Sequence, residues 1–406
     1  MFNISLLLSA AVIIICVLAN KLSNKIGMPV LIAFIALGMV FGSDGILKIP
    51  FENYSFAEQI CSVALVFIMF YGGFGTKLSE AKPVAVKALL LSSVGVIFTA
   101  ALTTVFCFFV LKIKLLESML IGAVMSSTDA ASVFSVLRSK NLNLKYNTAS
   151  MLEMESGSND PFAYMLTVIV LSFMKGENSV GQMVYSIVAQ IVFGVLIGFL
   201  IALGAVWFMK HFTFNTSGFD AAFVLGVAVL AYALPTLVGG NGYLSAYIVG
   251  IVLGNQNIHN KKSLVHFFDG MTGLMQMLIF FLLGLLSFPS KILTVLLPSI
   301  FIALFITFVA RPLAVATVLA PFKTKISQYL VVSWAGLRGA ASIVFAIMAM
   351  VGGVTMEQDI FHIAFCVVLF SITLQGSLLP FVASKTNMID KTGSVLKTFN
   401  DYSDET

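Results

Sequence analysis

The stretch Ser126-Ser127-Thr128-Asp129-Ala130-Ala131-Ser132 places small polar residues and a carboxylate at the centre of an otherwise apolar segment, residues 116–138. A second polar stretch, Glu155-Ser156-Gly157-Ser158-Asn159-Asp160-Pro161, lies in another such segment, residues 149–174. An ionised carboxylate is costly in hydrocarbon, so an acid within a membrane span indicates a functional site. Together with Arg311, which lies in a later apolar segment, these residues predict a protein that moves ions or protons.

The composition is that of a membrane protein. Hydrophobic residues make up 59% of the 406 residues and charged residues only 10%, which is too little charge for a water-soluble surface. Many apolar stretches reach the roughly 20 residues of a helical span, and the alternating pattern of a membrane barrel is absent. We predict an all-α polytopic membrane protein of about 13 transmembrane helices, with these approximate limits: 4–22, 29–47, 57–76, 84–111, 116–138, 149–174, 183–209, 219–238, 243–258, 267–288, 291–320, 327–350 and 358–384.

Lysine and arginine are distributed unevenly between the two sides. One set of alternate loops, with the C-terminal tail, holds sixteen of the 23, the opposite set holds five, and Arg311 and Arg338 lie inside spans. Positively charged loops stay in the cytoplasm. We therefore expect a multi-pass protein of the cytoplasmic membrane with its N-terminus outside and its C-terminus inside. The net charge of +5 reflects this topology and does not indicate binding to nucleic acid.

No sequence motif indicates an enzyme or a cofactor. The four cysteines lie singly in apolar runs and form no Cys/His cluster, so they resemble small core residues. Neither HExxH nor GxSG occurs within a span. We expect a protein that is not an enzyme and that carries no cofactor.

Two spans are interrupted in the same way. The fifth becomes small and polar at Ser126–Ser132, and the twelfth does so at Gly336-Leu337-Arg338-Gly339-Ala340. The twelfth comes seven spans after the fifth, which is an odd number, so the two cross the membrane in opposite senses. Broken helices at corresponding positions of two halves indicate an inverted-repeat transporter with its site near the midplane. The repeats would be spans four to six and eleven to thirteen.

Depth along the helices brings several of these residues to one level. Asp160 lies about eleven residues into its span, which is roughly 16 Å at about 1.5 Å per residue, and Asp129 and Arg311 reach a comparable level. Pro161 frees the carbonyl of Gly157. A free carbonyl, a carboxylate and hydroxyl groups form the oxygen cage that a monovalent cation needs.

The motifs Thr128–Asp129, Glu155–Asp160, Ala310–Pro312 and Gly336–Ala340 resemble those of NhaP-type monovalent cation/proton antiporters, in order and spacing, over essentially the whole chain. Ser-Gly-Ser after Glu155, together with Pro161, resembles the potassium/proton subgroup. The resemblance implies exchange of K+, or of Na+, for H+ by alternating access in a lipid bilayer. It also implies a homodimer, and a cytoplasmic regulatory domain beyond the C-terminus.

The resemblance also implies how the chain is divided. Each protomer would have a core domain with two crossed, partly unwound helices and a separate dimerisation domain. Residues 1–83 and 176–290 would hold the dimerisation helices and a linker helix. Residues 84–175 and 291–385 would be the two core repeats, and residues 386–406 a cytoplasmic tail.

The resemblance assigns Asp160 as the acid shared by cation and proton, with Asn159, Ser156, Thr128 and Asp129 around the site. The cation would bind at Asp160, Thr128 and Ser156.

The other buried charges have structural interpretations, and some of them also have a transport interpretation. The resemblance pairs Glu155 with Arg311, either as a structural ion pair or as transport ligands. Asp129 either compensates the positive ends of half-helices or binds the cation. Arg338 would compensate half-helix C-termini.

Two other functional classes remain alternatives. A cation channel also has polar residues at depth, but it does not need a titratable acid at a helix break. A proton-coupled transporter of a small organic solute does need one, although the small side chains here favour a bare ion. With Asp160 as the only residue that changes charge, we expect electroneutral exchange.

Overall fold

The computed structural model describes residues 7, 10–19, 30–129, 132–133, 136–137, 142–176, 180–212 and 218–390. Parts of the predicted first and fifth spans and most of the predicted cytoplasmic tail, residues 386–406, lie outside these ranges. The described chain is almost entirely helical. Its elements, in order, are α2 (Val30–Phe41), α3 (Tyr54–Gly75), α4 (Leu78–Ala81), α5 (Ala85–Leu90), η1 (Leu91–Gly95), α6 (Val96–Phe109), α7 (Leu115–Val124), β1 (Asn143–Leu144), α9 (Thr148–Met174), α10 (Val180–His211), α11 (Phe219–Leu237), α12 (Gly242–Gly254), α13 (Lys261–Leu285), α14 (Pro289–Phe305), η2 (Ile306–Ala310), α15 (Arg311–Leu319), η3 (Ala320–Phe322), α16 (Ile326–Trp334), α17 (Ala340–Val351), α18 (Ile360–Phe370), η4 (Ser371–Gly376), α19 (Ser377–Lys385) and β2 (Ile389–Asp390).

Among the described residues, seven helices are long and apolar enough to cross a membrane, and shorter apolar helices occupy other predicted spans. The chain is thus a multi-pass membrane protein. Helix α2 ends at Phe41 although the predicted span ran to residue 47, because Gly42, Ser43 and Gly45 form a turn there, in which the Gly45 amide donates to the Gly42 carbonyl.

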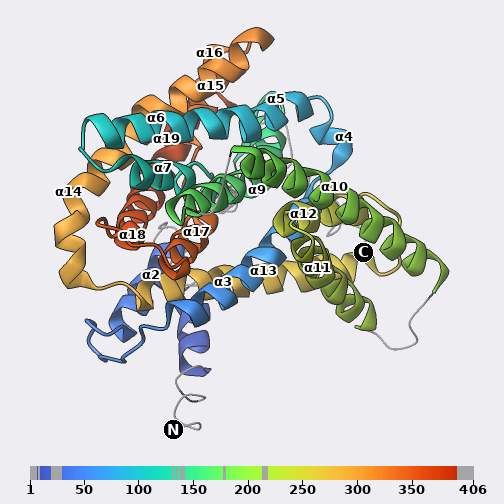
Figure 1. The fold of residues 1–406 in the computed structure, drawn as a ribbon. Coiled ribbons are helices and arrows are strands. Elements are labelled where there is room, and N and C mark those ends of the chain that lie inside the picture. Colours follow the sequence, from blue (N-terminus) through green and yellow to red (C-terminus); the bar gives the residue numbers. More distant parts are fainter. Residues whose placement is uncertain are drawn as a thin grey trace.

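The helices pack as two groups with α9 and α17 between them. The first group consists of helices that contact one another: α2, α3, α10, α11, α12 and α13. The second group is linked in the same way and consists of α6, α7, α14, α15, α16, α18 and α19. Helix α17 packs on α3, and α12 packs on α9, so these pairs join the groups. Figure 1 shows α10, α11 and α12 on one side of the molecule and α14 and α18 on the other.

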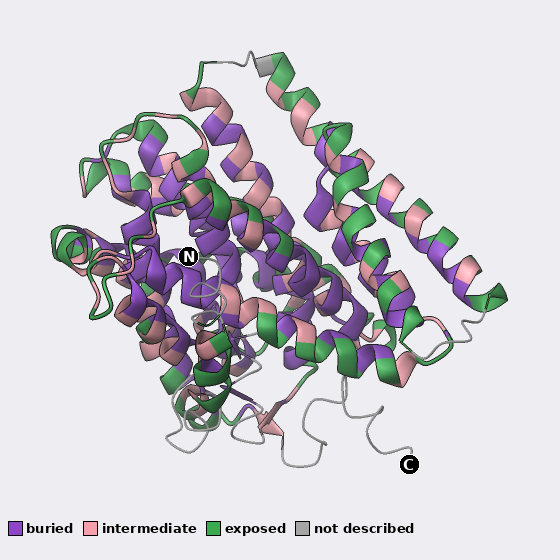
Figure 2. Ribbon diagram, turned by 90° about the horizontal axis from the view of Figure 1, so that it is seen from below, coloured by how far each residue is buried: buried purple, intermediate pink, exposed green. Residues whose placement is uncertain are grey.

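The outward faces of the peripheral helices are apolar. Helix α10 exposes Val188, Val192, Leu196 and Leu200, a composition suited to lipid contact. Figure 2 shows the exposed residues mainly on such outward faces, with the buried residues in the interior.

Glycines let helices of one group approach closely. A Cβ built at Gly194 would lie 2.9 Å from the Asn241 carbonyl oxygen, and one at Gly198 would lie 2.9 Å from Ser245 Cα. Helix α10 therefore lies directly against the backbone of α12, which places the start of α12 beside α9.

In the part of the chain that the structure describes, three long helices contain π-helical turns, at η1, η2 and η4. Such turns widen the helix locally and are frequent at functional sites. The turn η2 ends immediately before Arg311, and η4 begins with Ser371. Neither turn has a signal in the hydrophobic pattern, and the sequence did not predict them.

Two helices end in mid-course and face each other. After α7 ends at Val124, residues 125–129 are not helical, and between α16 and α17 residues 335–339 are not helical. The amide of Asp129 donates a hydrogen bond of 2.8 Å to the carbonyl of Leu337. The two breaks predicted from the sequence therefore meet inside the protein, where each satisfies part of the other's freed backbone.

Candidate functional site

Helix α9 carries the acidic motif through the middle of the molecule. It runs from Thr148 to Met174 without interruption, although Pro161 lies inside it. Proline has no amide hydrogen, so the carbonyl of Gly157 loses its helical donor. The Pro161 carbonyl accepts a hydrogen bond of 2.9 Å from Asn241 Nδ2 at the start of α12. The motif is therefore held in place by a hydrogen bond from α12 as well as by the hydrogen bonds within α9.

The carboxylate of Asp160 is nearly enclosed. Asp160 is 5% exposed, and Ser127 Oγ donates a hydrogen bond to Asp160 Oδ1. Ser127 lies in the break after α7, so this bond joins the break to α9. One neutral donor does not offset the cost of burying a full negative charge. A proton or a cation at this carboxylate would offset it.

Thr128 connects the same break to α9 twice. Ser156 Oγ donates to the Thr128 carbonyl over 2.5 Å, and Asn159 Nδ2 donates to Thr128 Oγ1 over 2.5 Å. Asn159 Oδ1 is buried and has no hydrogen-bond partner within the described residues. Hydroxyl, carbonyl and amide oxygens thus gather beside Asp160, and such oxygens suit a monovalent cation.

Asp129 lies between the two broken helices. Its Oδ1 accepts from the Ser132 amide over 3.3 Å, and its Oδ2 accepts from Ser132 Oγ over 2.6 Å. On the other side, a Cβ built at Gly339 would lie 2.6 Å from Asp129 Cβ. Gly339 is the residue before α17, so the carboxylate lies at the positive N-terminal end of that helix.

The Arg338 side chain reaches the break that follows the C-terminal end of α7. Its Nη1 donates to the carbonyls of Ser126 and Ser127, over 2.8 Å and 2.5 Å. Its own amide donates to Ser371 Oγ over 3.0 Å, and the residue is 1% exposed. The guanidinium therefore faces the negative C-terminal end of α7.

Glu155 and Arg311 form a buried ion pair. Arg311 Nη1 lies 2.6 Å from Glu155 Oε1, and the side chains are 3% and 1% exposed. Arg311 also donates to the Val332 carbonyl over 3.5 Å and lies against Gly336, where a Cβ would be 2.8 Å from Arg311 Nε. The pair thus joins α9, α15 and the second broken helix.

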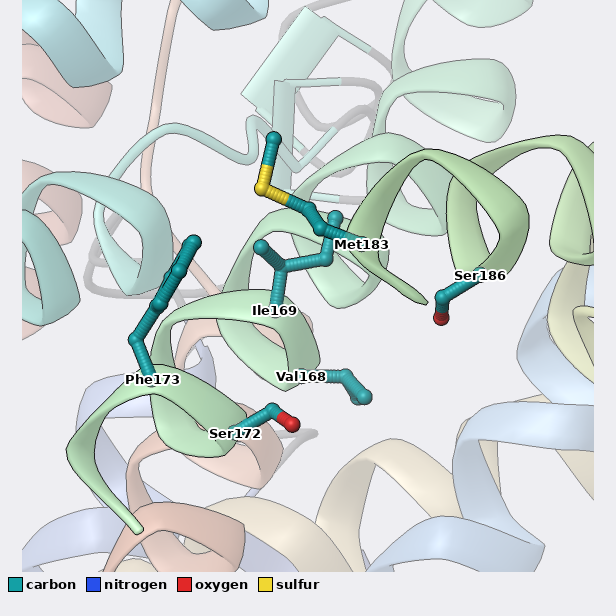
Figure 3. A pocket seen from close by; sticks show the side chains of 6 residues that line it. All are labelled: Val168, Ile169, Ser172, Phe173, Met183 and Ser186. Carbon is teal, nitrogen blue, oxygen red and sulfur yellow. The ribbon is translucent and has the colours of Figure 1, made fainter. Parts of the chain in front are cut away.

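A separate pocket lies near the far end of α9. It has a volume of about 40 Å³, and Val168 lies eight residues beyond Asp160, roughly 12 Å along the helix. Figure 3 shows the side chains of α9 and α10 that line it, namely Val168, Ile169, Ser172, Phe173, Met183 and Ser186. This pocket has no charged lining residue and is distinct from the site around Asp160.

The sequence matches the family described as "Sodium/hydrogen exchanger, transmembrane" over residues 8–385. The chain belongs to this family. The predicted resemblance to NhaP-type antiporters is thereby confirmed.

Curated relatives are similar to the exchanger over most of its length. The K(+)/H(+) antiporter NhaP2 of Shewanella sp. (strain ANA-3) is 36% identical over 388 residues, 94% of this chain and 67% of the relative. The K(+)/H(+) antiporter NhaP of Alkalimonas amylolytica is 34% identical over 375 residues, 92% of this chain and 65% of the relative. The exchanger thus spans about two thirds of the length of these relatives.

A solved structure has the same fold. The sodium proton antiporter MjNhaP1 from Methanocaldococcus jannaschii matches with a TM-score of 0.83 and 22% identity, covering 93% of the exchanger and 100% of that chain.

The structure brings the predicted site residues together from α9, α15 and the two breaks. Asp160, Asn159 and Ser156 on α9 contact the break at residues 127–128, Asp129 contacts the second break, and Glu155 contacts Arg311. Sequence reasoning missed Ser127 as the donor to Asp160, and Asn241. The only sequence signal for Asn241 was the turn Gly239-Gly240-Asn241-Gly242 between two apolar runs.

Proposed function

We propose that this chain exchanges K+ for H+ across the cytoplasmic membrane, with Asp160 holding either ion in turn. Family membership and the relatives named K(+)/H(+) antiporters support cation/proton antiport, and those names favour K+ over Na+. The single observation that carries the proposal is the enclosed Asp160 carboxylate with one neutral donor, beside the Asn159 amide oxygen, which has no hydrogen-bond partner among the described residues. Asp160, Thr128, Ser156 and Asn159 would supply the oxygens that replace the hydration shell of the cation.

The arrangement of broken helices supports two inverted repeats, residues 84–175 and 291–385, as a moving core. Helices α5–η1–α6 and α14–η2–α15 each contain one π turn, and each precedes a broken helix. Residues 1–83 and 176–290 would be the second domain, through which two protomers form a homodimer. Rocking the core against this domain would expose Asp160 to one side at a time.

The predicted count of 13 spans and the lysine and arginine distribution support an N-terminus outside and a C-terminus in the cytoplasm.

We assign Asp129 and Arg338 to charge compensation. Asp129 faces the N-terminal end of α17 and Arg338 faces the C-terminal end of α7, so each offsets half-helix charge of about half a unit. Glu155 and Arg311 hold α9 to the second repeat. These four residues would stay charged throughout the cycle.

A methyl group at Gly339 should disturb this compensation. In Gly339→Ala the new Cβ would overlap the Asp129 carboxylate, and we expect exchange to fall by at least about tenfold because small displacements in a preorganised site are costly. The rate is measured in membrane vesicles at equal protein content. Gly273→Ala is the control, since a Cβ there meets nothing within 4 Å. Equal rates for both variants would show that the Asp129–Gly339 contact is unimportant.

The charges of the cluster predict electroneutral exchange. The cluster holds three acids, Asp129, Glu155 and Asp160, and two arginines, Arg311 and Arg338, which leaves one negative charge that a single K+ or H+ balances. The membrane potential, about 2.3 kcal/mol per charge per 100 mV, then has no moving charge to act on. The test is transport in proteoliposomes under a potential imposed with an ionophore for an ion that the protein does not carry. A rate that follows the potential would mean that a second group titrates.

Everted vesicles test the function itself. Adding K+ to acid-loaded vesicles should release protons, and Na+ should do so with a higher half-maximal concentration. A channel would admit K+ without coupled proton release, and an organic-solute carrier would respond to neither cation. Either of those results would overturn the proposal.

A further inference from the structure

A line of polar side chains leads from Glu58 towards the site between the two groups of helices. Glu58 lies in the second turn of α3, and Ser62 Oγ donates a hydrogen bond of 2.9 Å to Glu58 Oε1. Helix α12, which carries Tyr243, packs along α3, which carries Ser62. Helices α9 and α11, which carry Tyr164 and Tyr232, also pack on α3. The phenol groups therefore lie on helices that neighbour the one carrying Glu58.

The aromatic rings of the three tyrosines pack against one another near Asp160. The rings of Tyr164 and Tyr243 meet edge to face at 5.1 Å, and the ring of Tyr232 lies 4.9 Å from that of Tyr243. Phe345 on α17 lies 5.9 Å from Tyr164 and completes the contact. Tyr164 is four residues after Asp160 on α9, so the two side chains lie on one helix face, one turn apart.

All these residues lie on the same side of Asp160. With the proposed orientation, α3 and α12 run inward from the outside, so Glu58 and Tyr243 lie in the outer halves of their helices. Helix α9 runs outward, which places Tyr164 on the outer side of Asp160. Tyr164 belongs to the proposed core, whereas Tyr243, Tyr232 and Glu58 belong to the second domain. A movement of one domain against the other would separate the rings.

We propose that Glu58, Ser62, Tyr164, Tyr232 and Tyr243 form the outer half of the ion route, which the Tyr164–Tyr243 contact closes in this structure. Glu58 draws the cation to this half-route, since a carboxylate at the mouth of a low-dielectric passage raises the local cation concentration. Once the rings separate, the hydroxyl oxygens and the aromatic faces supply the cation with partners on its way to Asp160. This inference rests on the proposed antiport through Asp160, and it assigns residues that the exchange step itself does not use.

The test compares the two faces of the membrane. The concentration of K+ that gives half-maximal exchange is measured in right-side-out vesicles, where added K+ meets the outer face, and in everted vesicles, where it meets the cytoplasmic face. For Glu58→Gln we expect a rise of roughly three- to tenfold at the outer face only, because the charge that concentrates K+ there is lost. Glu58→Asp, which keeps the charge, should recover most of the affinity.

Glu52→Gln is the matched control, since Glu52 is an exposed acid six residues earlier on the same side of the membrane. It should leave both faces unchanged. Tyr243→Phe keeps the ring and removes the hydroxyl. It should also raise the K+ concentration for half-maximal exchange, and only at the outer face.

An equal effect on both faces, an effect confined to the cytoplasmic face, or an effect of Glu52→Gln as large as that of Glu58→Gln would overturn the assignment of Glu58. If Asp160→Asn lost all exchange but Glu58→Gln had no effect at either face, the antiport proposal would be supported. Only the assignment of the outer half-route would then be wrong.

Discussion

Asp160→Asn should abolish cation/proton exchange while the protein still inserts and folds. The amide has nearly the shape of the carboxylate, and its oxygen still accepts the hydrogen bond from Ser127 Oγ that the structure shows at Asp160. It carries no charge and binds no proton near neutral pH, so neither a cation nor a proton has a partner. We expect less than about one tenth of the wild-type rate, a loss of more than about 1.4 kcal/mol.

The measurement is proton release from vesicles on addition of K+, with protein content and thermal unfolding in detergent determined in parallel. Asp44→Asn is the control, because Asp44 is an exposed outer acid that accepts hydrogen bonds from Ser290. It should exchange at nearly the wild-type rate. Exchange by Asp160→Asn above about a tenth would remove Asp160 from the central role, since a tenfold loss is only about 1.4 kcal/mol.

The site could be predicted from the sequence because charged residues are rare within membrane spans. Acids and an arginine within apolar segments are costly, so Asp129, Asp160 and Arg338 stood out without any knowledge of contacts. The breaks were visible at residues 126–132 and 336–340, where spans otherwise long enough to cross become small and polar. Both the position of the breaks and their meeting in one place follow from the need to satisfy freed backbone groups.

What the sequence could not provide was the pairing of partners across the fold. Ser126 and Ser127 look alike in the chain, but Ser127 Oγ donates to Asp160, whereas Ser126 Oγ donates to the carbonyl of Ala123. The choice depends on how the chain turns after α7, which helical periodicity does not encode. Asn241 contacts Pro161 from 80 residues away for the same reason.

Helix irregularities were equally hidden. The π turn Leu91–Gly95 interrupts an apolar run whose composition fits an ordinary helix, because the additional residue per turn is stabilised by packing and not by local propensity.

Glu155 and Arg311 should show strong coupling in stability. Each single change, Glu155→Gln or Arg311→Gln, leaves the other charge buried without its partner, which costs about 3–5 kcal/mol in the free energy of unfolding. The double change removes both charges and should recover part of that loss. The free energies are measured by denaturant titration in mixed micelles, for wild type, both single variants and the double variant.

An exposed ion pair provides the comparison that isolates burial. Lys114 Nζ and Glu357 Oε1 are 2.7 Å apart, nearly the distance between Arg311 and Glu155, but their side chains are 66% and 64% exposed. Water and salt already stabilise both charges there, so neutralising either should leave the unfolding transition unchanged. If the losses at Glu155 and Arg311 were simply additive in the double variant, the two side chains would not act as a pair. Equal sensitivity of the exposed pair would mean that distance, and not burial, sets the strength of the coupling.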